Sequence, residues 1–168
     1  MTPSMLDPVG HARILKDLDA ISERSGVPKR FLHESAALHC APAELDWLLN
    51  YYQVGHPGLK ITGVRALDRC MAIGGALIRN YIDARVRTMD QMIDDPVEAT
   101  VLICPNFYTL GHKGQTLPGW RVQKLYDVLC ERYKQDQPTV VWTESLEGLK
   151  EYGNAVYDLL SSFMTSKN

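Results

Sequence analysis

The sequence lacks long hydrophobic runs and any sign of a targeting segment. Its longest apolar stretches, such as residues 71–78, are far too short to cross a bilayer. The first seven residues do not have the basic and then apolar order of a secretory signal. We therefore predict a cytoplasmic protein with no membrane partner.

Clustered cysteines and a strong net charge are also missing. The four cysteines form no C-x-x-C pair and lie near a histidine only at His39-Cys40. We interpret them as reduced, mostly buried thiols and predict no metal site. Neighbouring residues on a helix or strand point apart, which disfavours His39 and Cys40 as a base and its nucleophile. The formal charge of −2 gives no global attraction for nucleic acid, so such binding would need a local patch.

Helical and strand patterns alternate along most of the chain. Asp7-Pro8 is typical of a helix start, Gly26 of a helix end, and Pro42 of the start of a second helix. The later patterns predict strands over 59–62, 84–88, 99–104 and 138–142 and helices over 66–80, 89–93, 120–134 and 152–164. Strands that alternate with helices predict an α/β fold of three layers, with a parallel sheet covered on both faces.

The length of 168 residues fits one globular body. We expect residues 1–54 to form an N-terminal helical segment that is not an independent domain. Residues 55–168 are expected to form the α/β domain.

The turn after the first predicted strand resembles a phosphate-binding loop that has lost its reactive groups. Residues 63–70 read GVRALDRC. Gly63 opens the pattern G-x-x-x-x-G-K-[ST], but Asp68, Arg69 and Cys70 replace its second glycine, its lysine and its hydroxyl. A carboxylate there repels phosphate, and a thiol is a poor ligand for magnesium. The loop is therefore expected to keep its shape without its nucleotide.

Ligands of parallel sheets bind beyond the carboxyl ends of the strands, and two more such places lack the expected groups. An ATPase would hold magnesium and water with acidic residues after the strand that ends at 104. Pro105 and Asn106 stand there. Ser145 follows the 138–142 strand where related folds commonly carry an amide that senses the γ-phosphate, and serine is a shorter substitute.

Five segments, in the right order, resemble the bacterial helicase-loader and transposition-ATPase family of AAA+ proteins. They are 26–31 (GVPKRF), 71–80 (MAIGGALIRN), 84–90 (ARVRTMD), 125–133 (LYDVLCERY) and 137–141 (QPTVV). The resemblance covers about residues 22–160 and implies an AAA+-like, P-loop-like core with degenerate nucleotide motifs.

Carried over by position, the resemblance puts a different residue at each nucleotide-binding place. Arg69 stands at the catalytic lysine and Cys70 at the magnesium hydroxyl. Pro105 and Asn106 stand at the paired acids and Ser145 at the sensor asparagine. Ala155 and Leu159 stand where the family has arginines in its last helix, and little room remains after that helix for the family's last strand and lid.

The resemblance therefore implies a binding protein without a cofactor, not an enzyme. We expect a DNA-replication accessory protein, similar to the replication B proteins of temperate phages, that binds a replicative hexameric helicase as a loader or loader mimic. One alternative is an accessory subunit or inhibitor of a related AAA+ ATPase of transposition or host helicase loading. Another is a residual nucleotide hydrolase that uses Arg69 with acids from elsewhere.

Two groups of residues are candidate contact surfaces. In the loaders the helicase contact precedes the nucleotide fold, which predicts partner contacts at Arg13, Lys16, Arg24, Lys29, Arg30 and Phe31. The alternative is that the first helix packs on its own sheet. Single-stranded DNA would be bound by phosphate pairing and base stacking at Arg65, Arg69, Phe107, Tyr108 and Lys113. The alternatives here are a solvated charged surface and rings that cover the edge of the core or line a protein contact.

Overall fold

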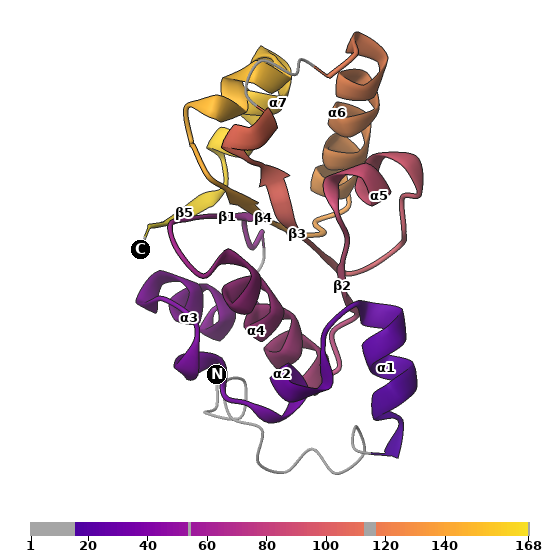
Figure 1. Ribbon diagram of the computed structural model, residues 1–168, viewed down its shortest axis with the longest axis vertical. Helices are drawn as coiled ribbons and strands as arrows, with labels where there is room; N and C mark the ends of the chain where they lie inside the picture. Colours follow the sequence, from indigo (N-terminus) through magenta and orange to yellow (C-terminus); the bar gives the residue numbers. More distant parts are fainter. Residues whose placement is uncertain (1–15, 54, 113–116, 168) are drawn as a thin grey trace.

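A parallel sheet forms the middle of three layers (Figure 1). The computed structural model describes residues 16–53, 55–112 and 117–167. All strand pairs are parallel, in the order β2-β3-β4-β1-β5. The strands are β1 (Leu59–Thr62), β2 (Ala84–Val86), β3 (Val101–Tyr108), β4 (Thr139–Thr143) and β5 (Met164–Lys167). The predicted α/β fold with a parallel sheet is confirmed.

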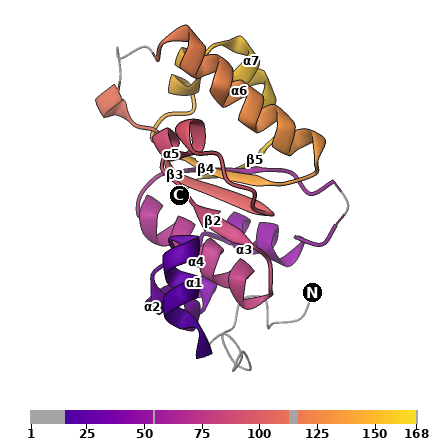
Figure 2. The same cartoon turned by 90° about the vertical axis from the view of Figure 1, so that its right-hand side faces the viewer.

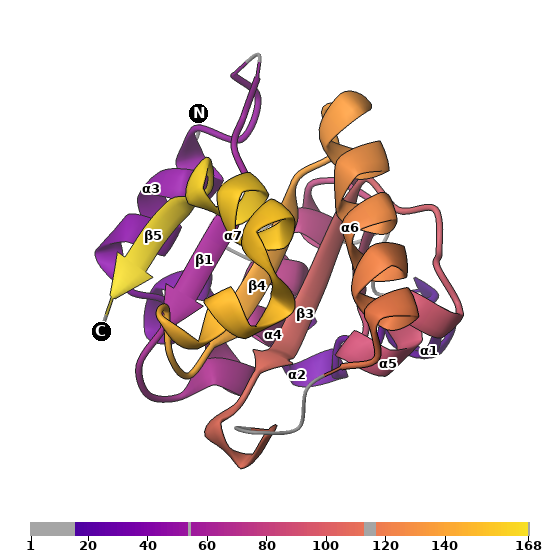
Figure 3. The ribbon, with the colours of Figure 1, turned by 90° about the horizontal axis from the view of Figure 1, so that it is seen from above.

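Helices cover both faces of the sheet. One face carries α1 (Leu18–Ser25), α2 (Lys29–His33), α3 (Pro42–Leu49) and α4 (Ala66–Arg79). The other carries α5 (Met89–Asp94), α6 (Gly119–Lys134) and α7 (Asn154–Ser161), and Figure 3 views the sheet through these helices with β5 at one edge. The short 3₁₀ helices are η3 (Ala36–Leu38), η4 (Leu110–His112) and η5 (Gly148–Tyr152).

The order of the strands explains this division. The chain crosses from β1 to β2 in one direction through α4, and then returns through β3 and β4 to β5 in the opposite direction. Crossovers between parallel strands are right-handed, so the two directions place their helices on opposite faces. Side chains alternate accordingly, with Leu59 and Ile61 in the core beside α4 and Leu102 and Cys104 in the core beside α6 and α7.

The helices before residue 54 share the first of these cores. A Cβ atom built on Gly75 of α4 would lie 2.1 Å from the carbonyl oxygen of Phe31, so only glycine lets the backbone of α2 approach α4 so closely. The Arg79 Nη1 donates a hydrogen bond to the same oxygen at 2.7 Å. Trp47 of α3 is fully buried and its Nε1 donates to the Pro57 carbonyl at 2.8 Å.

Two expectations about the ends of the chain need correction. The α1 helix begins at Leu18, because residues 16 and 17 are not α-helical, and the predicted start at Asp7-Pro8 lies outside the described residues. Gly26 ends α1 in the left-handed conformation, with φ of 74°, as predicted. The expectation that little room remained for a last strand was wrong, because β5 pairs with β1 in four positions.

The third predicted strand is also longer than expected. Pro105 and Asn106 lie inside β3, where the pairing with β4 is irregular between Cys104 and Tyr108. The strand thus continues through a proline that indicates a loop in sequence, because a bulge removes the need for its missing N–H.

Candidate functional site

The turn between β1 and α4, residues 63–65, lies where this fold class binds its ligands. The chain leaves β1 toward α4 on one face of the sheet, and it leaves the neighbouring β4 toward η5 and α7 on the other face. Such a divergence of neighbouring strands opens a crevice at their carboxyl ends. The side chains of this turn therefore decide whether a nucleotide can bind.

Arg69 points into the protein and not toward this crevice. Its side chain is fully buried, and its Nε donates to both carboxylate oxygens of Glu44, at 3.0 and 3.2 Å. Its Nη2 bonds Glu44 Oε1 and, at 3.3 Å, Ser166 Oγ. Its Nη1 donates to the carbonyls of Thr62 and Val64, at 2.9 and 3.1 Å. All of the guanidinium N–H groups are therefore used, and the prediction that Arg69 contacts DNA is wrong.

The carbonyl groups of residues 62–64 are all engaged within the protein. Here the carbonyls of Thr62 and Val64 face the Arg69 guanidinium, and the Gly63 carbonyl accepts a bond from Trp142 Nε1 at 3.1 Å. Three consecutive carbonyl oxygens thus bind donors from the protein itself.

Glu44, Arg69 and Ser166 form a buried polar cluster that joins α3, α4 and β5. Ser166 Oγ donates to Glu44 Oε1 at 2.8 Å, and the Ala41 N–H donates to Glu44 Oε2 at 2.8 Å. All three side chains of the cluster are fully buried. Sequence reasoning missed both partners of Arg69. The third position of a helix, which Glu44 occupies, is a common place for a glutamate that bonds the preceding backbone, but nothing local shows that it reaches Arg69.

The other residues of the altered loop are also engaged. Asp68 Oδ1 accepts a bond from Arg30 Nη2 at 3.1 Å, and Arg65 Nη2 lies 3.6 Å from Asp68 Oδ2. Cys70 is fully buried, and burial raises the pKa of its thiol far above the usual range. A neutral, enclosed thiol cannot serve as a magnesium ligand.

Two other residues that the resemblance assigns to the nucleotide site, Asn106 and Ser145, stabilise the starts of helices. Asn106 Oδ1 accepts a bond from the Met89 N–H at 3.1 Å, at the first residue of α5. Ser145 Oγ accepts a bond from the Gly148 N–H at 3.1 Å, at the start of η5. Both side chains thus bind backbone N–H groups of the protein.

The prediction that Phe107 and Tyr108 bind DNA is wrong. They are 0% and 1% exposed and pack edge to face on Tyr152, with ring centroids 5.5 and 5.7 Å away. The alternative that these rings belong to the core is confirmed. Arg65 has a half-exposed side chain whose Nη2 lies 3.0 Å from His39 Nδ1, and Lys113 lies outside the described residues.

The residues predicted to contact a partner also differ in their exposure and ion pairing. Phe31 is 1% exposed, so the prediction that it contacts a partner is wrong. Lys29 is paired with Asp19, and Arg30 with Asp68. Lys16 and Arg24 are exposed, whereas Arg13 lies outside the described residues.

Within the described ranges, no group of three or more His, Cys, Asp or Glu side chains could hold a metal ion. None of the helices found there has the length and apolar character needed to cross a membrane. The chain matches no protein-family model and no curated protein.

Proposed function

We propose that this chain is a DNA-replication accessory protein that binds a replicative hexameric helicase in the cytoplasm, as a loader or loader mimic, without hydrolysing ATP. The observation that carries the proposal is the buried pair of Arg69 and Glu44. By the resemblance Arg69 stands at the lysine of a phosphate loop, but its side chain is bonded to Glu44 inside the protein. An arginine that is already neutralised and fully bonded is not available to hold a triphosphate.

The strand order supports an AAA+-like origin for the scaffold. In an AAA+ core one strand separates the phosphate-loop strand from the strand that ends in acidic residues, and here β4 lies between β1 and β3. The order differs from both common doubly wound arrangements, in which the first strand lies next to the second. This strand order supports the proposal of a P-loop-like scaffold over that of a dinucleotide-binding one.

The segments that carry the resemblance bind one another in the core. Arg132 is 6% exposed and donates to the Pro138 carbonyl at 2.9 Å and to Thr139 Oγ1 at 3.0 Å. Burial lowers the pKa of Arg132 to about 10, so it remains a cation at neutral pH. The contact between Phe31 and Gly75 joins two other such segments. The segments on which the resemblance rests therefore have scaffold roles, which supports the proposal of a domain retained for binding.

Such a protein would act through binding energy alone. A loader shifts a helicase ring toward an opened state only by as much as it binds that state more tightly than the closed one. No step then requires a bond to be broken by this chain, and the loss of a nucleotide site does not remove the activity.

Two measurements on the purified full chain test the proposal. Isothermal titration with magnesium-ATP should give no binding, and size-exclusion chromatography should show a stable complex with a purified hexameric replicative helicase. Micromolar ATP affinity would favour a residual hydrolase. A complex with an AAA+ ATPase of transposition or host helicase loading, and none with the helicase, would favour an accessory subunit or inhibitor.

A further inference from the structure

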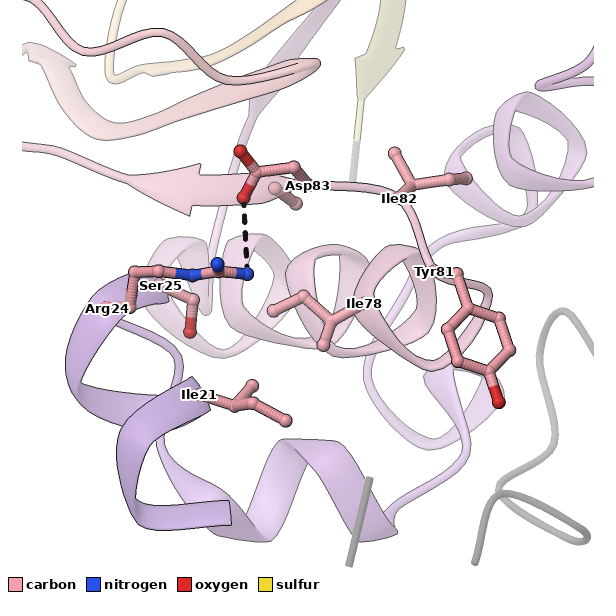
Figure 4. A pocket seen from close by; sticks show the side chains of 8 residues that line it. Ile21, Arg24, Ser25, Ile78, Tyr81, Ile82 and Asp83 are labelled. Carbon is pink, nitrogen blue, oxygen red and sulfur yellow. Dashed lines mark ion pairs between the residues drawn. The ribbon is translucent and has the colours of Figure 1, made fainter. Parts of the chain in front are cut away.

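A small cavity opens between α1 and the end of α4. Its volume is about 260 Å³ (Figure 4). Ile21 of α1, Ile78 of α4 and Ile82 of the following turn line it. Clefts that enclose drug-sized ligands have about 300–1,000 Å³. The cavity is therefore better matched to side chains of a partner segment than to a cofactor.

The apolar wall of this cavity is incompletely buried. Ile21 and Ile78 are partly exposed side chains at the margin of the core around α4. Figure 1 shows α1 at the outer edge of its layer, and in Figure 2 this helix faces the viewer below β2. An apolar side chain placed between the two isoleucines would remove their remaining surface from water, which favours binding.

Arg24 supplies a positive charge with free donors at the rim. Its Nη2 lies 3.7 Å from Asp83 Oδ1, which is beyond hydrogen-bond length. The Asp83 carboxylate already accepts bonds from Arg85, at 3.4 and 3.3 Å. Within the described residues Arg24 makes no hydrogen bond through its side chain, which is 64% exposed. The three charges sum to one surplus cation, so a carboxylate from a partner fits here.

Tyr81 stands at the end of the cavity in an unusual conformation. It follows the last residues of α4 with φ of 61°, in a place where glycine is preferred. A bulky side chain in this region is an outlier that needs a reason. The residue is 70% exposed. Exposed tyrosine and arginine beside an apolar pocket are the residue types that contribute most to protein interfaces.

We propose that the groove of Ile21, Arg24, Ile78, Tyr81 and Ile82 docks an acidic amphipathic helix. The helix inserts an apolar side chain between the isoleucines. A carboxylate three or four residues away, on the same helical face, pairs with Arg24, and Tyr81 packs against the helix. That this helix belongs to the replicative helicase rests on the proposed function, whereas the chemistry of the groove does not.

Two variants and two matched controls test the groove in the full chain. Tyr81→Gly removes the ring and suits the left-handed backbone, and Arg24→Gln removes the charge. The controls change another exposed tyrosine and another exposed cation, in Tyr52→Gly and Lys134→Gln. Thermal unfolding followed by circular dichroism confirms that each variant is folded before binding is measured.

The first probe is a synthetic library of helical peptides selected on the immobilised wild-type chain. Enriched peptides should combine an apolar residue with Asp or Glu three or four positions away. In fluorescence anisotropy their affinity should fall at least about tenfold for Tyr81→Gly and Arg24→Gln and stay unchanged for the controls. Selection of no peptide, of peptides without acidic residues, or of peptides that bind all variants equally would overturn the groove proposal.

The second probe is the purified helicase, and it separates the two proposals. Binding that weakens about tenfold in the two groove variants alone supports both. Equal binding by all variants keeps the helicase as partner and rejects the groove. If the wild type does not bind the helicase but the selected peptides behave as expected, the groove stands and the proposed function falls.

Discussion

Arg69 and Arg24 carry the same cation in opposite surroundings. Arg69 is fully buried, and every N–H of its guanidinium bonds an oxygen of the protein. Arg24 is largely exposed, and the carboxylate nearest to it already accepts bonds from Arg85. A buried charge is tolerated only when fully paired, whereas an exposed one need not be. The loop that resembles a functional site therefore has a structural arginine, and the margin of the helical layer has an available one.

The largest effect is expected from Glu44→Gln, which removes the counter-charge of Arg69. The substitution keeps the shape of the side chain but leaves a buried guanidinium uncompensated, at a cost of about 3–5 kcal/mol in the free energy of unfolding. Urea denaturation of the variant and the wild type measures the difference. A loss below about 1 kcal/mol would mean that water reaches Arg69, and the contrast with Arg24 would disappear.

A double variant is the control for this first prediction. Glu44→Leu with Arg69→Met replaces both charges by apolar groups of similar size, and such replacements are commonly neutral or stabilising. The double variant should therefore be clearly more stable than Glu44→Gln. If it is equally unstable, the loss reflects packing around α3 and not the unpaired charge.

The next effect is that of Arg69→Lys, which restores the lysine of a phosphate loop. Lysine has a single ammonium group that cannot bond Glu44, Ser166 and two carbonyls together, so we expect a loss of about 2–3 kcal/mol. Isothermal titration should still detect no magnesium-ATP, because the Asp68 carboxylate remains and the buried Cys70 still stands in place of the magnesium hydroxyl. Micromolar binding of magnesium-ATP by this variant would show that the arginine at position 69 alone prevents nucleotide binding in the wild type.

The sheet was predictable where apolar runs are local and bounded by turn residues. Residues 59–62, 99–104 and 138–142 have this pattern, and each became a strand. The fifth strand was missed because Met-Thr-Ser-Lys, residues 164–167, has no alternation of apolar side chains. It forms because pairing with β1 satisfies its backbone, which is a tertiary effect.

The site was less predictable because its contacts are remote in sequence. The loss of the phosphate-loop groups could be predicted from residues 63–70 alone. The burial of Arg69 could not, because Glu44 lies 25 residues before it and Ser166 lies 97 residues after it. The same limit applies to Phe107, which follows the predicted end of the third strand at residue 104 but lies inside β3, where the pairing is irregular.

The Tyr81→Gly variant should have an effect of the opposite sign, because it should stabilise the fold. Glycine adopts the left-handed conformation freely, so relief at φ of 61° should raise the free energy of unfolding by up to about 1 kcal/mol. Tyr81→Ala removes the ring but keeps a Cβ, and it should give no such gain. Equal stability of the two variants would mean that the turn is not strained. The backbone conformation of Tyr81 would then no longer support a role in binding.

The smallest effect is expected from Arg24→Gln, and it decides whether the two arginines truly differ. A pair at 3.7 Å on an exposed surface contributes little to stability, so the unfolding free energy should change by less than about 0.5 kcal/mol. Urea denaturation at low and high salt measures this, with Asp83→Asn as the companion variant. Because Asp83 also accepts bonds from Arg85, its loss should be larger than that of Arg24. A loss above about 1 kcal/mol for Arg24→Gln would make Arg24 a structural residue like Arg69, since a charge that the fold needs is not available to a partner.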